Sequence, residues 1–197
     1  MQKTQNNAKN IALAGIFSAI IIMLQLACAI PTPLPVSITL TLVPVVLGGA
    51  IMGVKYAAVL GAAFGLAAFT FSVFGWLGAG GVVMFNASPV LFFVTAMVKG
   101  ILAAVASAFV FSKLKKVNLY FAVLVAAMVA PIVNTGTFVI FFVLGYRDLL
   151  VQWAGGADIF GFLITGIVGI NFVLEFALNV LLAPVILRVI VAVKGNK

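Results

Sequence analysis

The chain has 197 residues, of which 65% are hydrophobic and only 7% are charged, and its mean hydropathy is +1.37. A soluble domain is roughly half apolar and about a quarter charged, so this composition excludes a soluble globular protein and indicates an integral membrane protein. With one cysteine and no histidine, the sequence excludes an internal disulfide, a Cys/His metal site and imidazole-based catalysis. We expect no metal and no other cofactor.

Six apolar runs follow one another along the chain, and only short connections separate them. A helix of about 20 apolar residues crosses the hydrocarbon core of a bilayer, so the runs predict an all-α integral membrane fold with six transmembrane helices. The short connections leave no room for a soluble domain, and we therefore expect one domain over residues 1–197. The runs lie at residues 10–30, 38–54, 56–74, 88–112, 118–145 and 159–192.

The basic residues are distributed unevenly between the two ends of these runs. Six crossings place both termini on one side, and nine of the eleven basic residues then fall on that same side. The positive-inside rule assigns this side to the cytoplasm. The net charge of +8 is then explained by topology and contact with anionic lipids, not by a nucleic-acid interface. The nine residues are Lys3, Lys9, Lys55, Lys113, Lys115, Lys116, Arg188, Lys194 and Lys197.

The three connections on the outer side have a different composition. They are residues 31–37, 75–87 and 146–158. The first contains three prolines, the second is rich in glycine, and the last two hold both tryptophans and two of the three acidic residues. Two interpretations fit: solvated loops with an interfacial aromatic belt, or a lid over an outward-facing pocket. On the second interpretation the candidates for solute contact are Trp76, Asn86, Arg147 and Trp153.

Polar residues from three different runs fall at one level inside the membrane. Lys99 lies about 15 Å along its helix from the outer end, and Asn134 and Asn171 lie at a similar level in the fifth and sixth runs. An ionisable residue at this depth is costly and usually functional. Their convergence predicts a solute pocket, and Thr137 joins the candidates because it lies beside Asn134 in the sequence.

Asn171, Glu175 and Asn179 are spaced four residues apart, so they share one face of a helix. Glu175 lies a turn deeper than Asn171, towards the cytoplasm. An ion pair between Lys99 and Glu175, with the asparagines linking helices, would account for this stripe without a ligand. We expect Asn171 to contact the solute, Glu175 to hold Lys99 or the bundle, and Asn179 to pack.

Pro131 interrupts the hydrogen-bond pattern of the fifth run, within APIVNTGTF. It removes one backbone donor and frees the carbonyl of Ala127. The following Asn-Thr-Gly could then loosen the helix and expose backbone groups to a ligand, or the proline could produce a simple kink. The sequence leaves both open.

A stripe of small residues runs down one face of the first helix. Its members are Ala8, Ala12, Gly15 and Ala19, at spacings of i, i+4, i+7 and i+11. Such stripes let another helix approach closely in lipid. The approaching helix belongs either to this chain's own bundle or to a separate membrane subunit.

Taken together, these features resemble the substrate-binding S component of energy-coupling factor (ECF) transporters. The resemblance depends on the six-helix layout, the small-residue stripe and four segments in this order. The segments are LVPVVLGGAIMGVKYAAVLGAAFGL (42–66), VKGILAAVASAFVF (98–111), APIVNTGTF (130–138) and INFVLEFALNVLLAPVILR (170–188).

The resemblance implies a multi-pass subunit of a prokaryotic cell membrane that captures a water-soluble vitamin or related micronutrient from outside. A transmembrane coupling subunit would dock on the stripe, and two ATP-binding subunits would supply energy as the S component topples to release its solute. In agreement, the sequence has no GxxxxGK[ST] phosphate loop. Lys99 and Arg147 favour an anionic solute such as pantothenate or a folate.

Two other functional classes stay open. A stand-alone carrier or channel would use Lys99 and Glu175 as an intramembrane relay. An intramembrane enzyme is disfavoured, because the apolar runs offer few catalytic groups.

Overall fold

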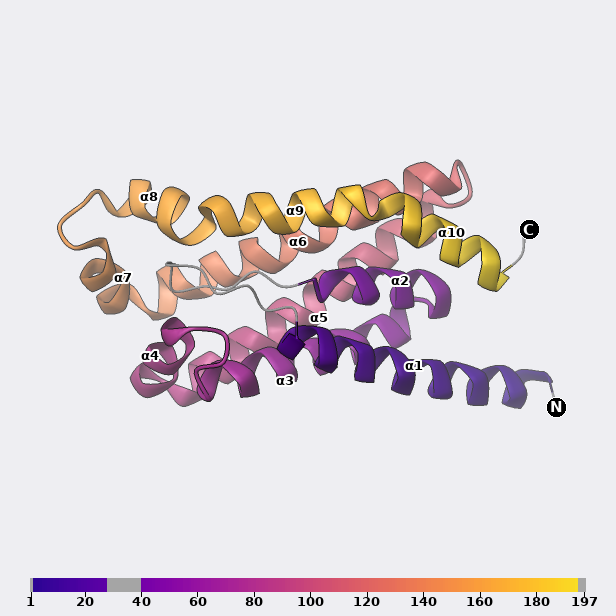
Figure 1. The fold of residues 1–197 in the computed structure, drawn as a ribbon, viewed down its shortest axis with the longest axis horizontal. Coiled ribbons are helices and arrows are strands. Elements are labelled where there is room, and N and C mark those ends of the chain that lie inside the picture. Colours follow the sequence, from indigo (N-terminus) through magenta and orange to yellow (C-terminus); the bar gives the residue numbers. More distant parts are fainter. Residues whose placement is uncertain (1, 28–39, 195–197) are drawn as a thin grey trace.

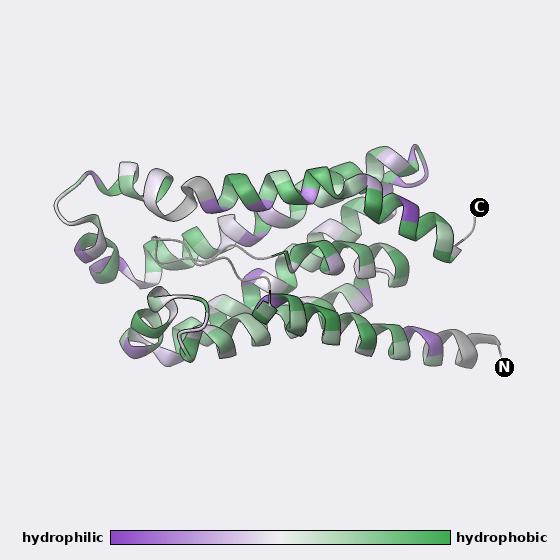
Figure 2. Cartoon of the chain, in the orientation of Figure 1, coloured by the Kyte–Doolittle hydropathy of each residue, from purple (hydrophilic) through white to green (hydrophobic). Residues whose placement is uncertain are grey.

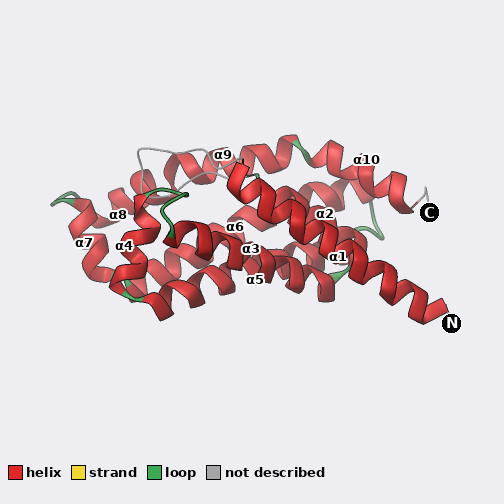
Figure 3. Cartoon of the chain, turned by 60° about the horizontal axis from the view of Figure 1, so that its bottom comes forward, coloured by secondary structure: helices red, strands yellow, loops and turns green. Residues whose placement is uncertain are grey.

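The computed structural model describes residues 2–27 and 40–194, and within these ranges every regular element is helical (Figure 3). The all-α prediction is therefore confirmed for the described residues. In chain order the elements are α1 (Gln2–Ala27), α2 (Leu42–Met52), α3 (Val54–Val73), α4 (Ala79–Ala87), α5 (Pro89–Leu114), α6 (Leu119–Gly145), α7 (Arg147–Ala154), α8 (Ile159–Phe162), the π-helical segment η1 (Leu163–Gly169), α9 (Ile170–Leu181) and α10 (Ala183–Lys194).

Five helical segments of the described residues are long and apolar enough to cross a membrane. They match the first, third, fourth, fifth and sixth predicted runs. The second run contains α2, whose 11 residues extend about 16 Å, roughly half the thickness of the hydrocarbon core. The count of six spans thus stays a prediction, and the proline-rich connection at 31–37 lies outside the described residues. The five segments are Ala8–Ala27, Val54–Val73, Pro89–Leu114, Leu119–Gly145 and Ile159–Leu181.

The long helices run side by side along the long axis of the molecule (Figure 1). Both termini lie at one end, with the α2–α3 and α5–α6 turns, whereas α4 and α7 lie at the opposite end. Figure 2 shows the long helices as predominantly hydrophobic. Lys55 and Lys113, which flank the two turns in sequence, belong to the end that carries the termini.

The predicted outer connections at 75–87 and 146–158 contain helices as well as loop. In α7, the buried residues Leu150 and Ala154 are four positions apart and form one apolar face. In α4, the buried residues Gly80 and Met84 have the same spacing. Both segments fold as short helices because each can bury one face on the bundle.

The packing of α3 on α5 brings the two backbones into direct contact. A Cβ atom at Gly61 would lie 2.5 Å from the carbonyl oxygen of Gly100, and one at Gly100 would lie 2.6 Å from the carbonyl oxygen of Gly61. At Gly65 the same atom would lie 2.6 Å from the carbonyl oxygen of Ala96. Only glycine permits this approach, which fixes the position of the neighbouring residue Lys99.

The turn between α2 and α3 is made at Gly53, whose φ of +91° favours glycine. Its N–H donates to the carbonyl of Gly49 at 2.8 Å, and its own carbonyl accepts from Ala57 at 3.0 Å. The predicted runs 38–54 and 56–74 put the break between them at Lys55, but Lys55 lies in the first turn of α3. The break comes earlier because Gly53 completes the last bond of α2.

Helix α6 runs without interruption from Leu119 to Gly145, with Pro131 inside it. Asn134 is therefore presented by regular helix and not by unwound backbone. The sixth predicted run is the irregular one, since η1 precedes α9 and a break at Leu182 precedes α10. Pro184, the second residue of α10, cannot donate a backbone hydrogen bond to the preceding turn.

The ends of α5 and α6 beside α4 and α7 are joined by a long-range hydrogen bond. The hydroxyl of Tyr146 donates to the carbonyl oxygen of Ser88 at 3.2 Å. The Phe142 ring lies beside Tyr146 and Trp153, with centroid separations of 5.8 and 5.4 Å. Burial raises the pKa of Tyr146 to about 12, so the hydroxyl stays protonated and able to donate.

Candidate functional site

A cavity of about 100 Å³ lies between α1, α3, α4, α5, α6 and α9. On the same measure one water molecule needs about 10–15 Å³, so the cavity has room for a small organic molecule. Its polar lining residues are Gln25, Ser72, Thr95, Lys99, Asn134, Thr135, Asn171 and Glu175. Its larger apolar lining residues are Phe64, Leu77, Met84, Phe92, Phe138 and Phe172.

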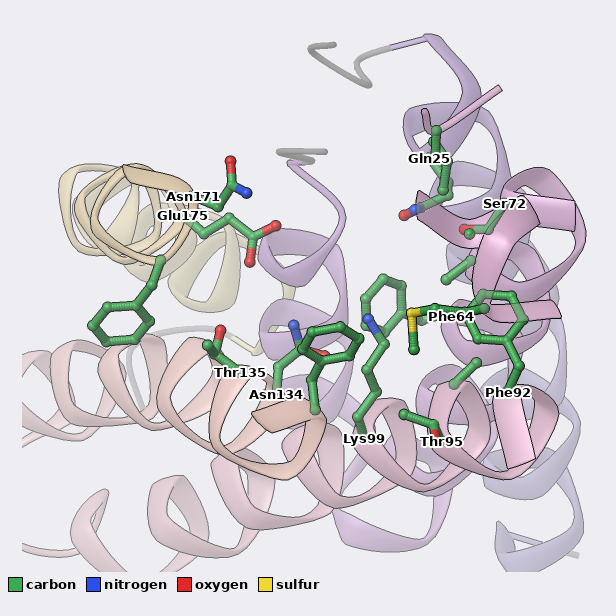
Figure 4. A pocket seen from close by; sticks show the side chains of 17 residues that line it. Gln25, Phe64, Ser72, Phe92, Thr95, Lys99, Asn134, Thr135, Asn171 and Glu175 are labelled. Atoms are coloured by element: carbon green, nitrogen blue, oxygen red, sulfur yellow. The ribbon is translucent and has the colours of Figure 1, made fainter. Parts of the chain in front are cut away.

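Lys99 extends from α5 into this cavity (Figure 4). Its ammonium nitrogen lies 5.5 Å from the ring centroid of Phe138 and 5.8 Å from that of Phe64. Aromatic faces attract cations at such distances, more strongly where water is scarce. Two ring faces therefore hold the cation at the cavity wall, and the side chain is half-buried.

Asn134 faces the same cavity from α6 and is only 6% exposed. Its side-chain oxygen has no hydrogen-bond partner among the residues that the structure describes. Buried polar atoms are almost always paired, and an unsatisfied acceptor costs about 1–3 kcal/mol. An acceptor that lines a cavity can be satisfied by a donor on a molecule that enters it.

Asn171 and Glu175 line the cavity from α9, across from the residues of α1 and α3 (Figure 4). The carboxylate of Glu175 is near enough to act electrostatically on the Lys99 ammonium. Asn179, one turn further along, lies outside the cavity lining and is 1% exposed. Its amide donates to the backbone oxygen of Glu175 at 2.8 Å, a bond within one helix that suits a packing role.

Sequence reasoning missed several cavity residues. Gln25 accepts a hydrogen bond from the hydroxyl of Thr41 at 2.5 Å, and both side chains are buried. Gln25 could have been found, because it is a polar residue within the otherwise apolar run IIIMLQLA. No comparable signal distinguishes Phe64 or Phe92, since the chain has 18 phenylalanines.

Five predicted solute contacts lie outside the cavity lining. Trp76 is 58% exposed and packs beside Phe71, and Asn86 and Arg147 are exposed. Trp153 is half-buried and stacks on Phe142. Thr137 points elsewhere because each helical residue turns by about 100°, which places it on the other side of Asn134 from Thr135. None of these five residues lines the cavity.

The predicted small-residue stripe lies on the outer surface of α1. All four members, Ala8, Ala12, Gly15 and Ala19, are exposed. A Cβ atom at Gly15 would have no other heavy atom within 4 Å. The buried face of α1 carries Ala14, Phe17 and Ile21 instead. Within the described residues, the bundle therefore packs on a different face of this helix.

Comparison with protein families gives one match that spans most of the chain. A family model described as "ECF transporter, substrate-specific component" matches residues 9–187. The match includes every residue that lines the cavity and three of the four stripe residues. Members of this family bind small-molecule substrates and associate with ECF coupling and ATPase modules, so they are transport subunits and not enzymes. Searches of curated proteins and of solved structures yield no significant match.

Proposed function

The chain belongs to the family of substrate-specific components of ECF transporters, and we propose that it captures a water-soluble vitamin or similar micronutrient from outside a prokaryotic cell. The observation that carries this proposal is the cavity within an apolar helical bundle. It is lined by the Lys99 ammonium and by the side-chain oxygen of Asn134, which has no hydrogen-bond partner within residues 2–27 and 40–194. Such a polar pair is costly in lipid and becomes favourable when a polar solute is bound.

The proposed orientation places the termini in the cytoplasm and α4 and α7 at the outer surface. One domain then crosses the membrane six times. The position of both termini beside the turns at Lys55 and Lys113 supports this orientation, because basic residues gather on the cytoplasmic side. Solute would enter from the end that carries α4 and α7.

The exposed stripe on α1 is the proposed docking surface for the transmembrane coupling subunit, which acts with two ATP-binding subunits. Two facts support this role. The family associates with such modules, and the described part of the bundle leaves the stripe uncovered. Small residues would let a partner helix approach closely.

Solute capture is tested by mass spectrometry of the purified protein, followed by calorimetric titration of the released molecule in detergent. We expect a vitamin-like molecule that rebinds without any ion gradient. A protein that carries no small molecule and binds none of the water-soluble vitamins would overturn the proposal.

Docking is tested by Gly15→Leu, with Ala27→Leu as the control. Ala27 is also exposed on α1 but lies about 90° around the helix from the stripe. We expect Gly15→Leu to abolish uptake by the complete transporter while solute binding and the melting temperature stay unchanged. Ala27→Leu should leave all three unchanged. If Gly15→Leu abolished binding instead, the stripe would belong to the chain's own fold.

A stand-alone carrier is the second candidate, because Lys99 and Glu175 line one cavity and interact electrostatically. Such a pair could relay protons across a membrane. Reconstitution of the chain alone in liposomes distinguishes the two functions. Robust uptake without coupling and ATP-binding subunits would favour the carrier and contradict the importer subunit.

A further inference from the structure

We propose that the cavity takes a small organic acid that also carries a hydroxyl or N–H donor. The acid group pairs with the Lys99 ammonium, and the donor bonds to the side-chain oxygen of Asn134. This inference rests on the proposed function, because it names the chemical class of the solute that the subunit captures.

The ammonium of Lys99 requires an acceptor that the aromatic wall does not supply. An ammonium carries three N–H donors, whereas Phe64 and Phe138 offer only ring faces, at 5.8 and 5.5 Å. A carboxylate would accept charge-assisted hydrogen bonds, which are about twice as strong as neutral ones. The water-poor surroundings strengthen this attraction. A neutral solute would supply no such charge-assisted bond and would leave Glu175 as the anionic group that acts on the ammonium.

Asn134 specifies the second feature of the solute. Its oxygen is a pure acceptor, lies in the cavity wall and has no hydrogen-bond partner among the described residues. Only a group with an O–H or N–H can satisfy it. Figure 4 shows Asn134 and Lys99 in the same region of the cavity, extending from α6 and α5. A solute must therefore present both an acid group and a donor to this cavity.

Glu175 limits the charge of the solute. Its carboxylate faces the cavity from α9 and already attracts Lys99. One lysine opposed by one glutamate cannot balance a polyanion such as a nucleotide. A simple cation would be repelled by Lys99. A monoacid with donor groups suits both charges, because its donors can lie on the side of Glu175.

The larger of the remaining cavity residues are apolar. Phe64, Phe92, Phe138 and Phe172 contribute ring surface, and the volume is about 100 Å³. These walls favour a compact apolar body between the polar groups of the solute. The class is thus a small amphipathic acid.

The acid requirement is tested with matched pairs of probes: pantothenate against pantothenol, and biotin against biotinamide. Each pair shares one body, and only the first member carries a carboxylate. By calorimetry on the wild-type protein, we expect an acid to bind at least about tenfold more tightly than its neutral counterpart, and Lys99→Gln to remove this preference. Equal or tighter binding of the neutral member would overturn the inference.

If neither acid binds, the inference is tested by identifying the molecule released from the purified protein. An organic acid with a donor supports the inference. A neutral or purely cationic vitamin overturns it but leaves the proposed function standing. A protein that holds and binds no small molecule overturns both.

The donor requirement is tested by Asn134→Leu, with Asn179→Leu as the control. Asn179 is also buried with an unpaired side-chain oxygen among the described residues, but it lies outside the cavity lining. We expect Asn134→Leu to weaken binding of the acid at least about tenfold, and Asn179→Leu to change the melting temperature without changing affinity. Unchanged affinity in Asn134→Leu, or equal losses in both variants, would overturn the assignment.

Discussion

Two walls of the cavity are built differently. One wall consists of α3, α5 and α6, and glycines bring α3 and α5 into backbone contact beside Lys99. The other wall is α9, which follows the π-helical segment η1 and ends at the break before Pro184. In the most apolar part of each span, 39% of the described residues are buried in α3 and in α5 and 33% in α6, against 20% in Ile159–Leu181.

This difference separates two kinds of polar residue that look alike in sequence. Lys99 and Asn134 project from regular helices held by close packing, so their positions are well defined. Asn171 and Glu175 project from a helix that begins directly after η1, and π-helical turns often occur at functional sites. A closely packed wall can select a solute, whereas an irregular, less buried wall can adjust to it. Four predictions test this comparison.

The largest effect is expected at the contact between α3 and α5. In Gly100→Ala, the added Cβ atom would lie 2.6 Å from the carbonyl oxygen of Gly61, a backbone atom that cannot turn away. Overpacking of this kind costs about 1–3 kcal/mol, occasionally more, and we expect about 3 kcal/mol. Thermal unfolding in detergent measures the loss.

Gly136→Ala is the matched control for that substitution. Gly136 lies within α6, and a Cβ atom there would have nothing within 4 Å. We expect an unchanged or higher melting temperature, because alanine favours a helix over glycine by about 0.5–1 kcal/mol. Similar melting temperatures for the two variants would show that the α3–α5 contact is not the rigid part of the wall.

The two walls are compared directly by Asn134→Ala and Asn171→Ala. The first removes an unpaired acceptor from the packed wall, and we expect solute binding to weaken by about 1–3 kcal/mol. The second removes an amide that already interacts with another group of the protein, from a wall that can adjust, and we expect less than about 1 kcal/mol. Calorimetric titration of the co-purified solute gives both values. A larger loss of affinity in Asn171→Ala than in Asn134→Ala would show that α9 is the wall that selects the solute.

The polar residues of the cavity were predictable to the extent that they interrupt apolar runs. Lys99, Asn134, Asn171 and Glu175 stand out in this way, and helical spacing placed them at one level. All four line the cavity. Polar residues near the ends of runs, such as Asn86 and Arg147, carry no comparable signal, because both interfaces and lids contain them.

The apolar half of the site could not be predicted, since it depends on which helices touch. Phe64 lines the cavity only because Gly61 and Gly65 bring α3 against α5. Nothing local distinguishes these glycines from Gly15 or Gly136, where the neighbouring space is open. For the same reason α4 and α7 could not be predicted. Each forms because the bundle offers a surface against which a short segment can bury one face.

A smaller effect is expected where α5 and α6 are joined beside α4 and α7. Tyr146→Phe removes the hydrogen bond to the carbonyl oxygen of Ser88. That oxygen also accepts from the N–H of Phe92 at 3.0 Å, so it is not left unsatisfied, and we expect a loss of only about 0.5–1 kcal/mol. The control is Tyr120→Phe, at a tyrosine that is 49% exposed, where the melting temperature should not change. Equal melting temperatures for wild type and Tyr146→Phe would show that this hydrogen bond does not stabilise the packed wall.

The last effect, which is absent at neutral pH, is a pH dependence at the same tyrosine. Burial raises the pKa of Tyr146 to about 12, from about 10 in an unfolded chain. Below pH 10 the hydroxyl is protonated in both states and stability is unaffected. Between about pH 10 and 12 the unfolded state loses this proton more readily than the folded state, so the free energy of unfolding falls.

Phenylalanine has no proton to lose, and Tyr146→Phe therefore lacks this pH-dependent component of stability. The stability advantage of the wild-type protein should narrow and then reverse as the pH rises from 9 to 12, whereas a constant difference would show that the hydroxyl has the same pKa in the folded and unfolded states. Melting curves of the two proteins over this range make the measurement, because the two proteins differ only at this side chain.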